Sequence, residues 1–520
     1  MQRLISNIKN SNCELRYDKR KIYRRDQEMV KISIKNTKRH KISPYLFMQF
    51  AEPLGCADSS IDAAWDWLNE RWQPGAVDMI KQLAPPMIRW GGCFSSYYHW
   101  YEAIGPQSER VPMLNLCWDG FYRNMVGTCE LAELAKEVKS ELLFCVNFES
   151  DGRKRWAEPK PGMNRSGDAS EAADWVRYCN DPDHPLRKKH GYQKPFNIKY
   201  WQIGNETSYD PTGFSADENA SLAPHFIKKM READPSLKFI VWGDGLNAAW
   251  RERYSRGDTC EWTEKVCESV ADSSCMVAFH NHFGDTADYQ ILEGMNYRQD
   301  ADLTWEKTLL ASVDFEQRIK YMRNSVKPYG NKLAITEAHF NIKGRHRGDY
   351  LSSWYAGVAY ARCVNVLQRH ADLVEIATLA DFVGTRWQNN AIMLPSPWDN
   401  GGAPYFLPAG TIMKLMSQHI GEFTIDLDVD ADSEIDAQAS CSGNKYYLHL
   451  INLNRSKTQK IDLQMGTESI IPTKILEISA DPAEEICCIS PNLFQPKMIL
   501  AKAAEYALPP AAVAVLEFEI

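Results

Sequence analysis

The sequence lacks the features that mark an exported, membrane-spanning or nucleotide-binding protein. Its first nine residues are polar and contain no apolar core of the length that a signal peptide needs. No apolar run approaches the ~18 residues that cross a bilayer. Neither a Gly-x-Gly-x-x-Gly fingerprint nor a Walker sequence occurs. These absences predict a soluble, cytoplasmic protein and weigh against a doubly wound nucleotide-binding sheet.

Paired cysteine motifs and clustered basic charge are also missing. The 14 cysteines are scattered with no Cys-x-x-Cys, so we expect reduced thiols that mostly pack as small buried residues. The formal net charge is -8, and the basic run Lys19 to Arg25 is short. Binding a phosphate backbone needs a clustered excess of Lys and Arg. We therefore expect no nucleic-acid partner and no membrane partner.

What the sequence does contain is an alternation of short apolar strands with helix-compatible segments. One such helix is Thr128 to Ser140, whose Leu131, Leu134, Ala135 and Val138 recur at helical spacing. Eight β-rich segments follow one another: Ile42 to Phe50, Met87 to Gly92, Leu142 to Phe148, Tyr200 to Glu206, Phe239 to Gly245, Met276 to His282, Leu333 to Phe340 and Leu373 to Phe382. Eight strands that alternate with helices predict a (β/α)8 TIM barrel, an α/β fold.

The pattern changes after about residue 410. Lys445 to Asn452 and Ala514 to Ile520 alternate in the way typical of a β-sandwich. Pro395 to Pro408 is rich in Pro and Gly, as domain boundaries are. Met29 to Asn36 is another strand-like piece. We therefore predict an N-terminal segment, residues 1–40, that joins the sandwich, a catalytic barrel of residues 41–408, and a C-terminal β-sandwich of residues 409–520.

Two glutamates stand where predicted strands end. The fourth segment ends with Asn205-Glu206, and Glu337 lies toward the end of the seventh. In a parallel barrel these ends face one mouth. Retaining glycoside hydrolysis needs a carboxylic acid and a carboxylate about 5 to 5.5 Å apart, and such a pair splits its pKa values so that one group stays protonated. The spacing predicts Glu206 as general acid/base and Glu337 as nucleophile.

The fourth segment also resembles a known family. Trp201-Gln-Ile-Gly-Asn-Glu206 is similar to the acid/base strand of clan A glycoside hydrolases, above all of the family 51 α-L-arabinofuranosidases. The stretch from Ile42 to Gly55 resembles that family's first strand, which implies that Glu52 holds a sugar hydroxyl. Met87 to Trp100 resembles the second-strand motif, which implies that Arg89 orients the nucleophile. The resemblance implies a barrel glycosidase.

Further matches extend nearly end to end, through Val146-Asn147, Phe279 to Gly284 and Leu508 to Leu516. An amide such as that of Asn205 can hydrogen-bond a sugar 2-hydroxyl, and His280 is expected to contact the nucleophile region. Tryptophan faces complement the apolar face of a sugar, although most tryptophans should be core. The expected substrate-binding residues are Glu52, Arg89, Asn147, Trp201, Asn205, His280 and Asp381.

Three motifs depart from the family pattern. The usual Arg-aromatic-Pro-Gly-Gly is Arg89-Trp-Gly-Gly here, and Asp-Glu-Trp is Thr336-Glu337-Ala338. At strand eight Gln-x-Val-Asn becomes Asp381-Phe-Val-Gly384, so a carboxylate replaces an amide that usually touches the sugar. The chain therefore resembles a divergent family member, and Asp381 is the residue expected to bear on the sugar accepted.

The leading hypothesis is an exo-acting retaining α-L-arabinofuranosidase that acts on a glycoside or oligosaccharide without a cofactor. No metal is expected, because His280 and His282 alternate along a strand end and should point to opposite sides. The resemblance also implies a possible homo-oligomer. Alternatives with the same mechanism are a β-xylosidase, a galactofuranosidase or a β-glucuronidase-like enzyme. Alternatives of other classes are a non-catalytic carbohydrate-binding barrel and a metal-dependent hydrolase.

Overall fold

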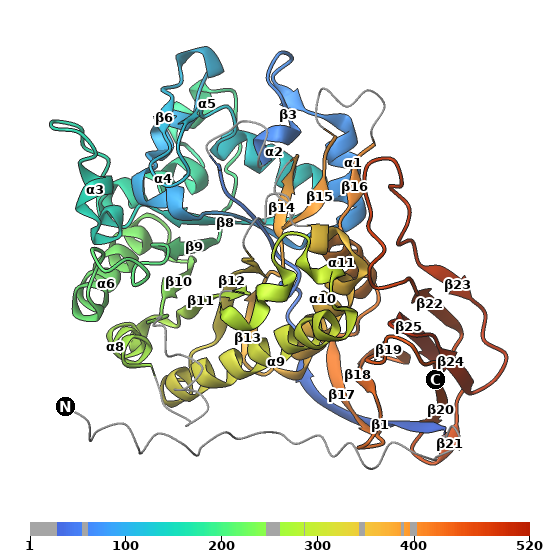
Figure 1. The fold of residues 1–520 in the computed structure, drawn as a ribbon. Helices are drawn as coiled ribbons and strands as arrows, with labels where there is room; N and C mark the ends of the chain where they lie inside the picture. Colours follow the sequence, from blue (N-terminus) through green and yellow to red (C-terminus); the bar gives the residue numbers. More distant parts are fainter. Residues whose placement is uncertain are drawn as a thin grey trace, which may run out of the picture.

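The computed structural model describes residues 29–54, 61–245, 260–284, 286–342, 349–385, 389–395 and 403–520. The basic run Lys19 to Arg25 and residues 396–402 of the expected linker lie outside these ranges. Two sheets organise the described chain, a mainly parallel sheet covered by helices and a second sheet built mostly from the C-terminal strands (Figure 1). Among the described helices, none is both long and apolar enough to cross a membrane.

The parallel sheet contains strands from all eight predicted segments, side by side in chain order. Its strands are β2 (Gln49–Ala51), β5 (Met87–Trp90), β8 (Glu141–Val146), β9 (Tyr200–Ile203), β10 (Lys238–Trp242), β11 (Met276–Phe283), β12 (Leu333–Phe340) and β13 (Val374–Ala377), extended beyond β2 by β14 (Asp381–Gly384), β15 (Asn390–Met393) and β16 (Tyr405–Phe406). Neighbours pair in parallel except β15 and β16. The carboxyl ends of β2 to β13 therefore lie along one edge.

The sheet is strongly curled. Tyr45, which precedes β2, forms a parallel bridge with Ile376 on β13. The Met48 N–H also donates to the Ala377 carbonyl at 2.9 Å. These contacts bring the first and eighth predicted strand segments together, although β2 and β13 stand well apart in the strand order.

Helices fill the connections between the parallel strands. They are α1 (Pro74–Leu83), α2 (Thr128–Val138), α3 (Lys154–Ala157), α4 (Ala169–Asn180), α5 (Pro185–Lys189), α6 (Ala216–Ala233), α8 (Glu261–Ser269), α9 (Ala301–Val326) and α10 (Trp354–Arg369), and α11 (Pro408–Ser417) follows the last strand. Helix α2 buries Leu131, Leu134, Ala135 and Val138, as the helical spacing predicts. It ends at Val138, and the next residue, Lys139, adopts a left-handed conformation.

The first and eighth predicted strands depart most from their predicted bounds. In the first, Pro44 has no N–H to give to a ladder, and β2 covers only the last residues of the predicted segment. The eighth is divided, because the chain turns between β13 and β14. There the Thr378 hydroxyl donates to the Ala380 carbonyl at 2.9 Å. As a result Asp381 begins a new strand, which pairs with β2 at Phe50.

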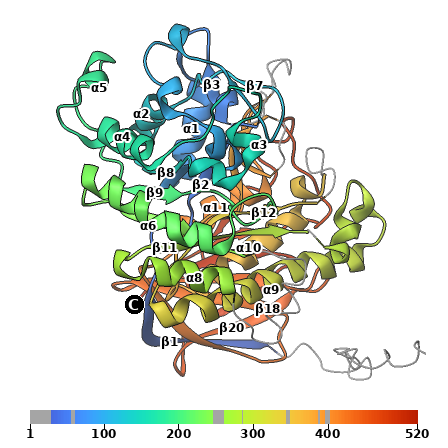
Figure 2. The same ribbon diagram turned by 90° about the vertical axis from the view of Figure 1, so that its left-hand side faces the viewer.

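The second sheet has ten strands and includes one from the N-terminal part of the chain. Its strands are β1 (Val30–Lys41), β17 (Phe423–Val429), β18 (Ile435–Ser442), β19 (Lys445–Asn452), β20 (Gln459–Met465), β21 (Glu468–Ser469), β22 (Lys474–Ile478), β23 (Lys497–Ile499), β24 (Glu505–Leu508) and β25 (Val513–Glu519). Strand β1 lies between β17, antiparallel to it, and β20, parallel to it. Figure 2 shows β1 beside β20 at the base of the molecule. The strand predicted at residues 29–36 thus joins the C-terminal strands.

Helix α10 joins the two sheets. Asp436 on β18 is buried, and it accepts hydrogen bonds from Asn365 at 2.8 Å and Arg369 at 3.1 Å on that helix. The indole N–H of Trp354, at the start of the same helix, donates to the Ala511 carbonyl at 2.8 Å. The two sheets therefore share a buried, hydrogen-bonded interface that includes a charge pair.

Candidate active site

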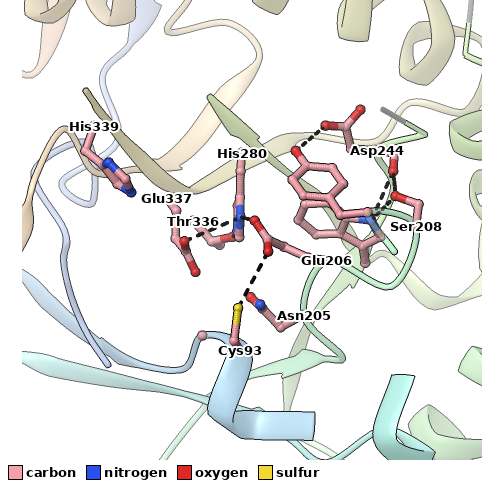
Figure 3. A network of polar contacts seen from close by, with 12 residues as sticks. Cys93, Asn205, Glu206, Ser208, Asp244, His280, Thr336, Glu337 and His339 are labelled. Carbon is pink, nitrogen blue, oxygen red and sulfur yellow. Dashed lines mark hydrogen bonds and ion pairs between the residues drawn. The ribbon is translucent and has the colours of Figure 1, made fainter. Parts of the chain in front are cut away.

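Glu206 and Glu337 meet at the carboxyl-terminal edge of the parallel sheet (Figure 3). Glu206 comes three residues after the end of β9, and Glu337 lies on β12. One carboxylate oxygen of each lies within 4.8 Å of the other. The backbone of Glu206 is left-handed, with φ +52°, a conformation unusual for residues other than glycine. Its side chain is 12% exposed and that of Glu337 is 8% exposed, so the pair is accessible but largely shielded from water.

A buried arginine links three strands beneath this pair. Arg89 on β5 is fully buried, and its guanidinium donates three hydrogen bonds. They go to Glu337 Oε1 at 2.9 Å, Asn205 Oδ1 at 2.7 Å and Gln202 Oε1 at 2.8 Å. Charge-assisted bonds of this kind are stronger than neutral ones. Arg89 therefore fixes the orientation of the Glu337 carboxylate, while its expected role of orienting a nucleophile stays a prediction.

Only the oxygen of the Asn205 side-chain amide has a hydrogen-bond partner among the described residues. Its oxygen accepts from Arg89, while its Nδ2 group is buried and has no hydrogen-bond acceptor among the described residues. Figure 3 places this amide beside Glu206 and Cys93. A buried donor without a partner is costly, and a sugar hydroxyl is an acceptor that would satisfy it.

Glu52, just after β2, lies at the same edge. Its Oε1 accepts from the Cys93 backbone N–H at 2.7 Å and from the Trp118 indole at 2.9 Å. Burial raises the pKa of Glu52 well above its ordinary value, and the nearby Glu337 raises it further. Gly92 has φ +145°, and any Cβ there would collide with the Glu52 carboxyl. The second glycine of the Arg89-Trp-Gly-Gly motif is therefore required by the space that Glu52 occupies.

His280 on β11 connects the two glutamates. Its Nδ1 lies 2.8 Å from Glu206 Oε1 and 3.6 Å from Glu337 Oε2. Its Nε2 lies 2.9 Å from the Thr336 hydroxyl, and the Trp242 ring meets the imidazole edge-on, with centroids 4.7 Å apart. Burial lowers the pKa of His280 well below the usual histidine range. The buried imidazole therefore favours its neutral form, and its closer carboxylate partner is Glu206 rather than Glu337.

The expectation that His280 and His282 point to opposite sides is wrong. Residues i and i+2 of a strand share a face, and the two rings lie 6.0 Å apart. Together with Glu206 and Glu337 they offer ligand atoms within 4.8 Å of one another. A metal ion here would compete with the guanidinium of Arg89 for Glu337 and with the existing contact between His280 and Glu206. The geometry fits a metal, but Arg89 already neutralises the Glu337 carboxylate, and His280 already forms a hydrogen bond with Glu206.

The remaining predicted substrate residues have different surroundings. Asn147 donates to the Arg165 carbonyl at 2.8 Å and accepts from the Ser150 N–H at 3.0 Å, so its amide holds loop backbone, and a sugar contact stays a prediction. Asp381 is 8% exposed, lines a small cavity together with Glu52, and lies 4.0 Å from His339. Asp381 thus lies near the predicted hydroxyl-binding glutamate.

Trp201 does not reach the site, so its predicted substrate contact is corrected. The side chain has 0% exposure and packs edge-on against Trp175 on α4 and Phe144 on β8. Its indole N–H donates to the Ile198 carbonyl at 3.1 Å. Alternation along β9 turns Trp201 toward the covering helices and Gln202 toward Arg89.

Three residues of the site were not predicted from the sequence. Gln202 supports Arg89, Thr336 contacts His280, and the Cys93 thiol lies 3.8 Å from Glu206 Oε2. Gln202 and Thr336 are polar residues inside otherwise apolar strands, a signal that could have singled them out. Cys93 follows the glycine pair of the Arg89 motif, and no feature of its own type distinguishes it.

Known proteins share both sequence and fold with this chain. Residues 79–283 match the model of the alpha-L-arabinofuranosidase 1 domain. A probable alpha-L-arabinofuranosidase C of Aspergillus fumigatus is 31% identical over 236 residues, which cover 43% of this chain and 44% of that protein. The match therefore spans less than half of the length of that relative. An intracellular exo-alpha-(1->5)-L-arabinofuranosidase 1 of Bacillus subtilis is 27% identical over 64% of this chain and 63% of its own length.

The fold similarity is more extensive than the sequence similarity. The GH51 alpha-L-arabinofuranosidase of Thermotoga petrophila superposes with a TM-score of 0.74 over 94% of this chain and 100% of that structure, at 21% identity. At that identity the superposition supports the fold alone, and the sequence matches carry the kinship. Together these similarities make the chain a relative of the α-L-arabinofuranosidases, with sequence matches centred on residues 79–283 and a fold shared over 94% of the chain.

Proposed function

We propose that the chain is an exo-acting retaining glycoside hydrolase that releases terminal α-L-arabinofuranosyl groups. The observation that most supports this proposal is the distance of at most 4.8 Å between a carboxylate oxygen of Glu206 and one of Glu337. Inverting enzymes keep their carboxyl groups roughly 6.5 to 9.5 Å apart to admit a water, whereas retaining enzymes use about 5 to 5.5 Å. The separation here favours direct attack by one carboxylate.

In this mechanism Glu337 attacks the anomeric carbon while the Glu206 carboxylic acid protonates the departing glycosidic oxygen. The glycosidic bond breaks, and a glycosyl ester forms on Glu337. Glu206, now a carboxylate, then removes a proton from water, and the water oxygen attacks the anomeric carbon to release the sugar and Glu337. Arg89 orients Glu337 through Oε1, and neutral His280 positions Glu206. Glu206 therefore serves as acid in the first step and as base in the second.

The surrounding groups fit a neutral sugar. Asn205 offers its Nδ2 group, and Glu52 offers a carboxyl whose Oε1 is already held by Cys93 and Trp118. Glu52 and Asp381 line one small cavity of about 10 Å³. Among the described residues, the lining of this cavity includes no basic side chain that would pair with the carboxylate of an acidic sugar. A β-glucuronidase-like activity is therefore less expected than an arabinofuranosidase, β-xylosidase or galactofuranosidase activity.

The proposal also includes the architecture and the setting of the enzyme. The contacts of Tyr45 and Met48 with β13 support closure of the parallel sheet into a (β/α)8 barrel over residues 41–408. The pairing of β1 supports one C-terminal β-sandwich domain made of residues 1–40 and 409–520. The Bacillus subtilis relative is named an intracellular enzyme, which supports a cytoplasmic location.

The test is hydrolysis of a panel of aryl glycosides, namely α-L-arabinofuranoside, β-D-xyloside, D-galactofuranoside and β-D-glucuronide. Wild type should cleave the arabinofuranoside best, and proton NMR should detect the retained anomer first. Glu337→Gln should lose at least about 3 kcal/mol of transition-state stabilisation, which is more than a hundredfold in kcat/KM. Glu477→Gln, a buried glutamate of β22 that contacts Tyr506, is the matched control and should remain active.

The outcomes separate the alternatives. Equal activity of Glu337→Gln and wild type would contradict the assigned nucleophile. A first product with inverted anomeric configuration would contradict the retaining mechanism, but the protein would still be a glycoside hydrolase. Binding of a glycoside without cleavage of any panel member would favour a non-catalytic carbohydrate-binding barrel.

A further inference from the structure

A second, larger cavity has a lining separate from the carboxylate pair. Its volume is about 630 Å³, and its lining includes neither glutamate of the pair nor Arg89. Aromatic side chains dominate the wall, accompanied by a few polar groups. The aromatic members are Trp65, Trp67, Phe121 and Tyr122, and the principal polar members are Asp62, Gln73 and Arg123. A concave site with an apolar wall and a few polar groups is the usual form of a small-molecule site.

The connections that follow several parallel strands build this cavity. One hairpin, β3 (Trp65–Asp66) with β4 (Arg71–Trp72), follows β2. A second hairpin, β6 (Met113–Leu114) with β7 (Phe121–Tyr122), follows β5. Thr385, directly after β14, contributes to a third wall. These connections leave the same edge of the sheet that carries Glu206 and Glu337, so the cavity and the candidate active site open from one end of the sheet.

Two structural links connect the cavity to that site. Trp118 lies in the turn of the second hairpin and donates to Glu52 at 2.9 Å, while Phe121 of the same hairpin lines the cavity. On the other wall β14 begins at Asp381 and ends one residue before Thr385. Four residues of extended strand span about 13 Å. Thr385 on the cavity wall thus lies farther from Asp381 than a single sugar ring spans, but within the length of a short oligosaccharide.

The chemistry of the wall matches a neutral saccharide. Trp67 is 59% exposed and Phe121 is 66% exposed, although both are large aromatic residues. Such side chains held in water at a concave surface mark a binding site, and their faces complement the C–H face of a sugar ring. Arg123 and Asp62 bring opposite charges and Gln73 brings an amide, so the lining has no strong charge of one sign to select a polyanion.

We propose that this cavity is a remote subsite for the aglycone side of the substrate, and that it binds a neutral saccharide unit of an oligosaccharide whose terminal sugar occupies the Glu206 and Glu337 site. The inference rests on the proposed function and deepens it. It makes the enzyme selective for glycosyl groups on a saccharide chain over the same groups on a small aglycone.

The test compares two substrates with Trp67→Ala and Phe121→Ala. One is the aryl glycoside that wild type cleaves best, and the other is an oligosaccharide of at least four units that ends in the same sugar. Each variant should lose about tenfold in kcat/KM on the oligosaccharide, the upper range for one aromatic stacking contact, and should keep its activity on the aryl glycoside. Tyr329→Ala, a partly exposed aromatic residue outside the cavity, should change neither value.

Two results would overturn the subsite. One is unchanged oligosaccharide hydrolysis in both variants, and the other is an equal loss on both substrates, which would indicate damage to the catalytic centre. If wild type cleaves no glycoside, the proposed function fails and calorimetric titration with the oligosaccharide decides the subsite separately. Binding that Trp67→Ala abolishes and Tyr329→Ala preserves would support it, while absence of binding to wild type would reject it.

Discussion

Replacement of Arg89 by lysine tests the central element of the candidate active site. The guanidinium donates to three acceptors at 2.7 to 2.9 Å from a fully buried position. A single ammonium keeps the positive charge but cannot span acceptors on Glu337, Asn205 and Gln202 together. Each acceptor left unpaired costs about 1 to 3 kcal/mol. If the ammonium pairs with only one of them, the total loss is about 2 to 6 kcal/mol, shared between folding and the transition state.

We therefore expect Arg89→Lys to lower kcat/KM by about a hundredfold, equivalent to about 2.7 kcal/mol. Its urea midpoint should also fall. The assay is steady-state hydrolysis of the best aryl glycoside, with urea unfolding measured on the same preparations. Arg110 provides the matched control, because it is similarly buried and makes two hydrogen bonds to Glu130, at 2.6 and 3.1 Å, away from the carboxylate pair. Arg110→Lys should lower the urea midpoint and leave kcat/KM unchanged.

A kcat/KM of Arg89→Lys within threefold of wild type would refute this role of Arg89. That role is also refuted if Arg110→Lys loses as much activity as Arg89→Lys, because the loss would then follow from stability alone. A loss confined to Arg89→Lys would show that the orientation of the Glu337 carboxylate matters for the reaction.

Three further predictions concern protonation and metal ions. Burial raises the pKa of Asp151 to about 7, so the folded chain holds a proton that the unfolded chain releases above about pH 4. The free energy of unfolding should therefore fall as pH rises from about 4 to 7, and Asp151→Asn should remove up to about 4 kcal/mol of that fall in urea titrations; identical pH profiles would contradict this. Burial lowers the pKa of His449 to about 4, so stability should be lost as pH drops from about 6.5 to 4, and His449→Gln should remove up to about 3 kcal/mol of that loss. An unchanged acid midpoint of unfolding would argue against it. Dialysis against EDTA should leave hydrolysis intact, since Arg89 already neutralises Glu337, whereas a loss that zinc restores would reveal a metal enzyme.

The meeting of Glu206 and Glu337 could be predicted because it needs only strand order and direction. Parallel strands place their carboxyl ends at one edge, so a residue at the end of β9 and another on β12 approach each other without any knowledge of side-chain packing. The three-way contact of Arg89 is different. Burial of an arginine depends on acceptors from other strands, and its contact with Glu337 was expected from family resemblance rather than from its own segment.

The orientation of single residues was harder to predict. Trp201 and Gln202 are neighbours in a strand that is buried on both faces, so local hydrophobicity does not show which side chain points inward. Trp175 on α4 decides the question by packing against Trp201. The position of Asp381 depends on the turn after Thr378, whose hydroxyl contact with backbone interrupts the apolar run. Both outcomes depend on tertiary partners that an isolated segment does not reveal.

The pairing of β1 has a consequence for how the chain folds during its synthesis. Ile32 pairs with Val429, so this early strand can form its native pairing only after the ribosome has added about 400 more residues. At 5 to 20 residues per second the wait lasts roughly 20 to 80 s. Throughout that time the backbone groups of β1 and the side chains of Ile32 and Ile34 lack their native partners.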